Sequence, residues 1–342
     1  MNYIKTPCIY NVFTHYICIF KDCQINFIFF PVDKYSTKRY NVFTHYISLV
    51  NMFSKSIKKK LSEHFSTPVR HKHLLEHAER IIGQTRYSVV ANLIRDLRKN
   101  SVVNSYKLTA KNSKTVTLYC SRKLDKLNPY EIARAMFPQG YFCNLTSIFY
   151  HSLTNQVPKA IYICTSAKRI NVNTVNNNEL RRAFIKPHRH TKHVYTLNDY
   201  KVIVVERRAR ISGSGVVESH PPSTLLPNTS RVTCIERSLI DAVVSPQYNG
   251  GIVSVYTYFR NARGMLNMAR LIKIYRQLDF VYPYSQSIGF LLDRADMSKH
   301  ASVIYKNFPP ERSFYVDHDA KTTWVYDEKW KLYYPAGLVN ED

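Results

Sequence analysis

The chain has 342 residues, 45% of them hydrophobic, which is enough apolar material for globular cores and excludes a chain that is disordered throughout. Lys and Arg number 49 against 24 Asp and Glu, so the formal net charge is +25 at pH 7. A charge of this size predicts a strong positive field on some face and favours nucleic acid as the partner. A generally basic protein without such a partner is the alternative that charge alone leaves open.

The seven cysteines have no paired spacing typical of a zinc ribbon or a disulfide framework, so we expect reduced thiols in a reducing compartment. The apolar stretch from Tyr16 to Phe30 is interrupted by polar and charged side chains. It therefore lacks the roughly 18 consecutive apolar residues of a membrane span, and it is followed by no cleavage site typical of a signal peptide. We expect a cytoplasmic protein with no membrane partner.

The octapeptide YNVFTHYI occurs at residues 10–17 and again at 40–47. Two copies do not make a solenoid, because such folds need about three or more stacked units. Met52 follows the second copy, and regular hydrophobic patterns begin there. We interpret residues 1–51 as an N-terminal extension translated from DNA upstream of a start at Met52. Under this hypothesis the repeated DNA, rather than the repeated peptide, is functional and contains the operator.

Basic residues are concentrated in the next part of the chain. Residues 52–127 carry 17 basic and 5 acidic groups, whereas residues 128–342, almost three times as many, carry 27 and 17. A localised basic region is the first sign of a nucleic-acid-binding domain. We therefore predict two domains, 52–127 and 128–342, with the first one binding DNA.

Hydrophobic spacing in residues 52–127 predicts three helices and a hairpin, the order of a winged helix-turn-helix. The helices are expected at 57–65, 72–82 and 87–99, and the hairpin strands at 102–109 and 114–120. The third helix is the predicted recognition helix, with Asn92 and Arg95 reading bases and the hairpin lysines contacting phosphates. A small helical module with a solvated basic face is the alternative. The predicted DNA-binding side chains are Arg86, Ser88, Asn92, Arg95, Arg98, Lys99, Lys107, Lys111 and Lys114.

Two histidine patterns suggest metal chemistry. His73, Glu76 and His77 form an H-x-x-E-H pattern typical of inverted zinc proteases, but a third ligand and a partner helix are not evident. His188, His190 and His193 lie in a basic run, where an exposed loop or a phosphate contact is the commoner explanation. We expect no catalytic residues, no metal and no cofactor. A nucleic-acid-processing enzyme, either a nuclease or a zinc hydrolase, is the alternative function.

From residue 128 onward a series of short motifs occurs in a characteristic order. They are Tyr141–Ile148, His151-Ser152-Leu153, Gln156-Val157-Pro158, strands at 160–165 and 201–207, Cys234–Asp241, Tyr248-Asn249-Gly250-Gly251, Gln286–Leu292 and Trp330–Pro335. Together they resemble the AbiEi family of antitoxin regulators over residues 128–338. Ser152 departs from that pattern, because the family has glycine there.

The resemblance implies an α+β (mixed α/β) protein in which a winged helix precedes an AbiEi-like C-terminal domain. It also implies a non-enzymatic autorepressor of a bacterial type IV toxin–antitoxin system. Its partners would be double-stranded promoter DNA and, without a stable complex, a nucleotidyltransferase-like toxin.

The second domain has a predicted loop insertion and a group of charged motif residues. The stretch 209–230, rich in Gly, Ser and Pro, predicts a loop insertion. The family motif residues Glu236, Arg237 and Asp241 begin an amphipathic helix. They are interpreted either as helix capping with a buried ion pair or as a scaffold beside a toxin-regulating or DNA-contacting surface. Gly250 and Gly251 complete the predicted antitoxin-domain motif.

Overall fold

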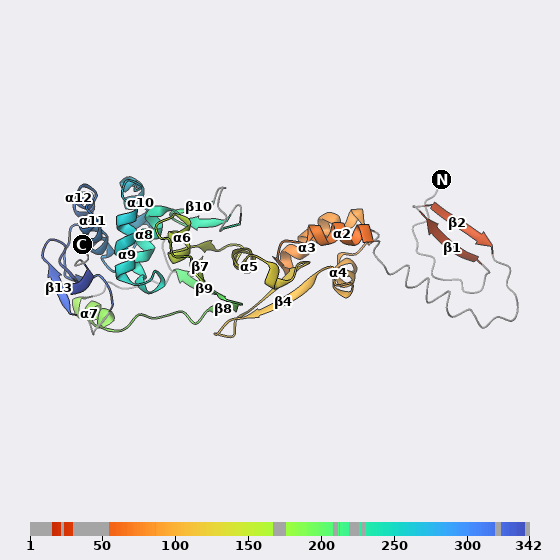
Figure 1. Cartoon of the computed structure of the whole chain (residues 1–342), viewed down its shortest axis with the longest axis horizontal. Helices are drawn as coiled ribbons and strands as arrows, with labels where there is room; N and C mark the ends of the chain where they lie inside the picture. Colours follow the sequence, from red (N-terminus) through yellow and green to blue (C-terminus); the bar gives the residue numbers. More distant parts are fainter. Residues whose placement is uncertain are drawn as a thin grey trace. The chain divides into compact units, whose positions relative to one another are not determined.

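The computed structural model describes residues 16–21, 24–29 and 55–338, with gaps at 86, 167–175, 208–210, 212, 219–225, 228–229 and 319–322. The chain separates into two compact units, residues 1–58 and 59–342. The predicted boundary at 127/128 falls inside the second unit. Figure 1 shows the elements along the chain.

In the first unit, β1 (Tyr16–Lys21) and β2 (Gln24–Phe29) form an antiparallel hairpin. Their sequences, YICIFK and QINFIF, are rich in the β-branched and aromatic residues that favour strands. The hairpin lies within the predicted extension, whereas the second octapeptide copy at 40–47 lies outside the described residues.

Removal of residues 1–51 is expected to leave the thermal unfolding of the remaining chain unchanged, because those residues belong to the separate first unit. Circular dichroism of the shortened and full-length proteins checks this expectation. A large fall in the midpoint of the shortened protein would show that the extension contributes to the fold of the second unit.

The N-terminal part of the second unit combines helices with a three-stranded sheet. The sheet has the order β3-β5-β4, and both strand pairs are antiparallel. The predicted helices and hairpin occur here, although the third helix begins at Val90 rather than at residue 87, and β3 was not predicted. The elements are α2 (Lys55–His64), β3 (Val69–Arg70), α3 (His71–Ile81), η1 (Ile82–Gln84), α4 (Val90–Lys99), β4 (Asn104–Thr109) and β5 (Thr115–Cys120).

A six-stranded mixed sheet follows, with the order β10-β11-β6-β7-β9-β8. Its longest strands, β7 and β9, pair in parallel. The elements of this part are η2 (Leu124–Lys126), α5 (Pro129–Met136), β6 (Tyr141–Phe142), α6 (Asn144–Tyr150), β7 (Ala160–Ser166), α7 (Asn177–Ile185), β8 (Val194–Leu197), β9 (Tyr200–Arg207), β10 (Val216–Glu218) and β11 (Arg231–Thr233).

The predicted loop insertion at 209–230 is corrected by β10. Val216 and Val217 pair with Thr233 and Val232, so this stretch supplies an edge strand to the sheet. Two adjacent β-branched residues suit an edge strand, and the surrounding Gly and Ser concealed this signal in the sequence.

The last part packs helices α8–α12 over a large hydrophobic core that also includes the small sheet β12-β14-β13. Trp330 is fully buried against Gly289, where an added Cβ atom would lie 2.1 Å from the indole ring. This contact explains the glycine of the Gln286–Leu292 motif. The elements are α8 (Ile235–Val244), η3 (Pro246–Tyr248), α9 (Ile252–Asn261), α10 (Met268–Leu278), α11 (Tyr284–Arg294), α12 (Ser298–Asn307), β12 (Phe314–Tyr315), β13 (Trp324–Asp327), β14 (Leu332–Pro335) and η4 (Ala336–Leu338).

Ser152, which stands where the AbiEi pattern has glycine, adopts a left-handed conformation with φ of 57°. Glycine reaches this region without the steric cost that a Cβ atom imposes. The turn is thus formed with serine at this position.

The fold is of the mixed α/β class. Among the described residues, no helix is both long and apolar enough to span a bilayer. The described cysteines, Cys120, Cys143, Cys164 and Cys234, are buried and form no disulfide.

Candidate nucleic-acid interface

Helix α4 separates apolar from basic side chains. Leu93, Ile94 and Leu97 are buried, because they recur at the spacing that places them on one face of a helix. The opposite face is exposed to solvent. Its exposed polar and basic side chains are Asn92, Arg95, Arg98 and Lys99.

A side-chain hydrogen bond holds the segment before α4 against the helix. The Tyr87 hydroxyl donates a hydrogen bond to Asp96 Oδ2 at 2.6 Å, which ties the segment before the helix to its middle. Ser88 is exposed in this segment, and Arg95 Nε lies 3.9 Å from Asp96 Oδ1. Arg86 lies outside the described residues. The N-terminal residues of α4 are thus held in place with their polar side chains in solvent.

The β4–β5 hairpin, the predicted wing, also contacts the six-stranded sheet. At its tip, the Lys111 backbone N–H donates to Val194 O at 3.0 Å. The Lys114 ammonium lies 3.4 Å from a Glu206 carboxylate oxygen. The hairpin tip therefore packs against β8 and β9, and this long-range contact was not predicted.

The apolar side chains of the hairpin explain this packing. Val116, Leu118 and Cys120 alternate along β5 and belong to a core that also contains Tyr195 and Val202. Burial of these side chains fixes the hairpin against the six-stranded sheet. The side chains of Lys107, Lys111 and Lys114 nevertheless remain exposed.

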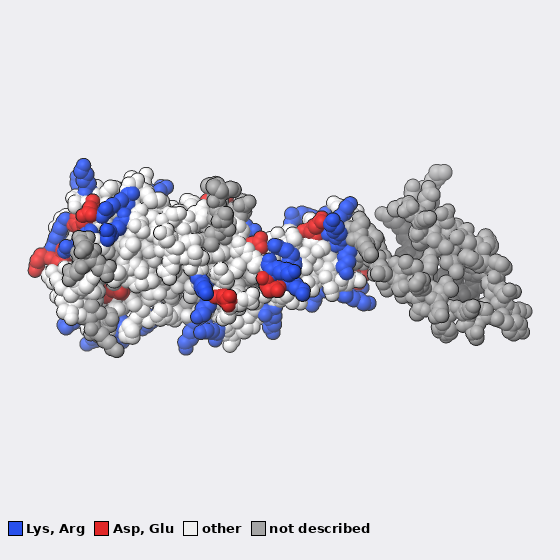
Figure 2. Space-filling model, viewed as in Figure 1, with Lys and Arg blue, Asp and Glu red and all other residues white. Residues whose placement is uncertain are grey.

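Basic residues predominate on this part of the surface. Figure 2 shows Lys and Arg side chains over the helices and hairpin of residues 59–120, with fewer Asp and Glu side chains between them. Arg98 on α4 lies 6.0 Å from the ring centre of Tyr119 on β5, which places a cation between helix and hairpin. The structure thus places the predicted residues of α4 and the hairpin on exposed positions of adjoining elements.

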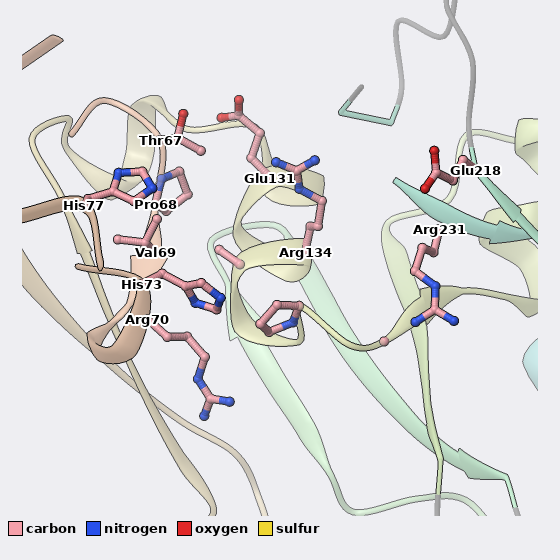
Figure 3. A pocket seen from close by; sticks show the side chains of 13 residues that line it. Thr67, Pro68, Val69, Arg70, His73, His77, Glu131, Arg134, Glu218 and Arg231 are labelled. Carbon is pink, nitrogen blue, oxygen red and sulfur yellow. The ribbon is translucent and has the colours of Figure 1, made fainter. Parts of the chain in front are cut away.

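The H-x-x-E-H pattern lies on α3, where His73 and His77 both line a cleft (Figure 3). Burial and then the neighbouring Arg80, His64 and His73 lower the pKa of His77 below its ordinary value. The described residues include no group of three or more His, Cys, Asp or Glu side chains suited to hold a metal ion.

The second histidine pattern is dispersed. His188 bonds to Asp317, and the ring of His190 contacts Tyr248. His193 is buried rather than exposed, and its Nε2 lies 3.1 Å from the Tyr195 hydroxyl. The run is therefore not a single exposed cluster, and the acidic partner of His188 comes from a residue that is distant in sequence.

Arg237 and Asp241 of the predicted antitoxin-domain motif are fully buried. Arg237 Nε donates to Asp241 Oδ1 at 2.9 Å, and an Arg207 nitrogen lies 3.1 Å from the same oxygen without an aligned hydrogen bond. Arg237 also donates to Ser214 O at 2.6 Å and to the Tyr141 hydroxyl at 3.3 Å. Burial opposes the charge of Arg237, but Asp241 outweighs it and raises the pKa of the guanidinium. This network joins α8 to the sheet, and its Arg237–Asp241 pair is out of contact with solvent.

The other motif residues also support the fold. Glu236 Oε1 accepts hydrogen bonds from the Asn267 backbone at 2.9 Å and from Arg270 at 2.8 Å, at the start of α10. Burial raises the pKa of Glu236, but these hydrogen bonds lower it by more than burial raises it. The pKa therefore lies below its usual value. Gly250 and Gly251 have φ of 80° and 87°, a conformation that favours glycine, directly before α9.

Comparison with family models and with curated proteins finds no match. Among solved structures, the chain is similar to the RV2827C protein from Mycobacterium tuberculosis, with a TM-score of 0.47 and 13% identity. The match covers 81% of this chain and 89% of that one. A similarity at this level assigns no function.

Proposed function

We propose that the chain is a DNA-binding transcriptional autorepressor of the AbiEi antitoxin type, in which α2, α3, α4 and the β4–β5 hairpin act as a winged helix. The observation that carries the proposal is α4, which buries an apolar stripe and exposes Asn92, Arg95, Arg98 and Lys99. In winged-helix proteins the third helix lies in the major groove, and residues near its N-terminus contact base edges.

The individual side chains suit different contacts with the duplex. Arginine pairs with guanine and asparagine with adenine through two hydrogen bonds each, so Arg95 and Asn92 are the proposed base readers. Lys107 on β4 is exposed and is assigned to the phosphate backbone, which fixes affinity and position but not sequence. Since the hairpin tip packs on the body, contact through β4 is favoured over contact through Lys111 at the tip.

The antitoxin role rests on the ordered motifs of residues 128–338 and their resemblance to the AbiEi family. In this proposal the chain acts in the cytoplasm without catalysis of its own. It opposes a nucleotidyltransferase-like toxin without forming a stable complex with it.

Substitution of Arg95 by alanine is expected to cost about 1–3 kcal/mol on the preferred DNA sequence and much less on random DNA, because a base contact is lost. Lys107→Ala should weaken binding to both DNAs alike. Fluorescence anisotropy of the full chain, with a duplex enriched from a random pool and a scrambled duplex, separates the two effects. Equal losses on both DNAs for Arg95→Ala would contradict its role as a base reader.

A further inference from the structure

A cavity with a volume of about 510 Å³ lies beside α7 in the helical part of the second unit. Its walls come from α7 and the segment 186–189 that follows it, from Val244 at the end of α8, and from Tyr282 and His318. Clefts of roughly 300–1,000 Å³ are typical of sites for small molecules. The size of this cavity therefore suits a small organic ligand.

Three cations lie in the lining of this cavity. Arg182 on α7 and Lys186 at its C-terminal cap are four residues apart, a spacing that places both side chains on one face of a helix. Arg189 belongs to the segment after the helix. All three residues are exposed to solvent. Because like charges at a spacing of four residues repel each other, an anion bound between Arg182 and Lys186 is favoured.

The carboxylates in and beside the lining already have other partners. Glu179 lies in the lining, but its Oε2 accepts a hydrogen bond from the Asn176 backbone N–H at 2.9 Å, as part of a capping box. Asp317 lies outside the lining and bonds to His188. In the part of the chain that the structure describes, the three cations form no ion pair. Their charge is thus available to an anion.

Contacts with the backbone hold the segment 186–189 in place. His318 Nδ1 lies 3.2 Å from the carbonyl oxygen of Lys186. Gln247 Nε2 donates a hydrogen bond to the carbonyl oxygen of Arg189 at 3.5 Å. The main-chain positions from which two of the cations project are therefore tied to other walls of the cavity.

The rest of the lining offers more than a bare inorganic ion needs. Pro187, Val244 and Tyr282 supply apolar surface beside the cations. The Tyr282 ring packs edge-to-face on Phe184, with 5.3 Å between the ring centres. An apolar wall with a few polar groups is typical of sites that bind the body of a small organic molecule.

We propose that this cavity binds a small organic phosphate, with its phosphate between Arg182 and Lys186 and its organic part against Tyr282. Arginine binds phosphate through two parallel charge-assisted hydrogen bonds, and lysine adds a compact charge. The phosphates of the DNA backbone share this chemistry. However, α7 and α4 lie at opposite ends of the second unit (Figure 1), so a small molecule is favoured over the duplex that α4 is proposed to bind.

Isothermal titration of the full chain with inorganic pyrophosphate and with ADP tests the site, at about 150 mM salt to screen exposed charges. We expect saturable binding of one molecule per chain, with ADP bound more tightly because its nucleoside contacts the apolar wall. Arg182→Gln and Lys186→Gln should each weaken binding about tenfold or more, since each removes a charged hydrogen-bond donor. Arg181→Gln is the matched control, because Arg181 is exposed on α7 but lies outside the lining. It should bind like the wild type.

Thermal unfolding of each variant shows whether it is folded. Absence of saturable binding of both probes would overturn the site, as would equal losses in the folded control and cavity variants. Pyrophosphate bound as tightly as ADP would overturn the place given to the organic part. Anisotropy with a scrambled duplex tests the other source of phosphate. A loss of duplex affinity in the cavity variants with unchanged binding of both probes would assign these cations to the DNA backbone and overturn the proposal.

Discussion

Asp241→Ala is expected to lower the free energy of unfolding by about 3–5 kcal/mol, because it leaves buried guanidinium groups without their carboxylate. Arg237 is fully buried and Arg207 nearly so, and both lie within 3.1 Å of Asp241 Oδ1. In a chain of this size each kcal/mol moves the unfolding midpoint by roughly 1.5–2 °C, so the midpoint should fall by roughly 5–10 °C. Denaturant titration and thermal unfolding measure the effect.

Asp296→Ala is the matched control. Asp296 pairs with Arg263, but its side chain is 81% exposed, and exposed pairs of this kind contribute about 0–1 kcal/mol. Similar losses for the two variants would show that the buried network does not stabilise the fold more than a surface ion pair does.

DNA affinity is expected to fall about 500-fold between about 50 and about 200 mM monovalent salt if the protein neutralises about five phosphates. The reason is counterion release, since the logarithm of the affinity falls by about 0.9 per neutralised phosphate for each tenfold increase in salt. Besides Arg95, the exposed basic side chains of α4 and the hairpin that are available for such contacts are Arg98, Lys99, Lys107, Lys111 and Lys114. Anisotropy titrations over a series of salt concentrations give the slope.

Single lysine variants show which charges contribute to that slope. Lys107→Gln should reduce it by about 0.9, because one phosphate contact is lost. Lys299→Gln, an exposed change on α12, should leave it unchanged. A slope near zero for the wild type, or the same reduction in both variants, would contradict the assignment of these charges to DNA.

Local patterns predicted much of the N-terminal part of the second unit. The stripe of Leu93, Ile94 and Leu97 is a local property of the sequence, since side chains three and four residues apart share a helix face. It predicted both the helix and its buried side. The predicted start of this helix was three residues too early, because Tyr87 bonds to Asp96 from outside the helix.

Contacts between distant residues were not predicted. The Lys111 N–H bonds to Val194, and Lys114 lies beside Glu206, 92 residues later. Nothing in the hairpin sequence specifies either partner, so the sequence predicted the hairpin but not the packing of its tip. For the same reason β3 and β10 were missed, because strands of two and three residues depend on their neighbours in the sheet rather than on a periodic pattern of their own.

The role of the motif around Asp241 was only partly predicted from the sequence. The sequence identified Glu236, Arg237 and Asp241 as one group, interpreted either as helix capping with a buried ion pair or as a scaffold beside a functional surface. All three side chains are inaccessible to solvent, and Arg237 and Asp241 form the buried ion pair of the first interpretation. Arg207, which completes the network from the end of β9, had no local signal that linked it to α8.

Photo-crosslinking from α4 tests most directly whether this helix contacts DNA. A benzophenone side chain in place of Asn92, which is exposed on α4, should form an adduct with a bound duplex on irradiation. The same side chain in place of Val303, which is exposed on α12, is the control and should form none. Crosslinks from position 92 alone are the result that we predict. Crosslinks from position 303 alone, or from neither position with DNA bound, would contradict the account.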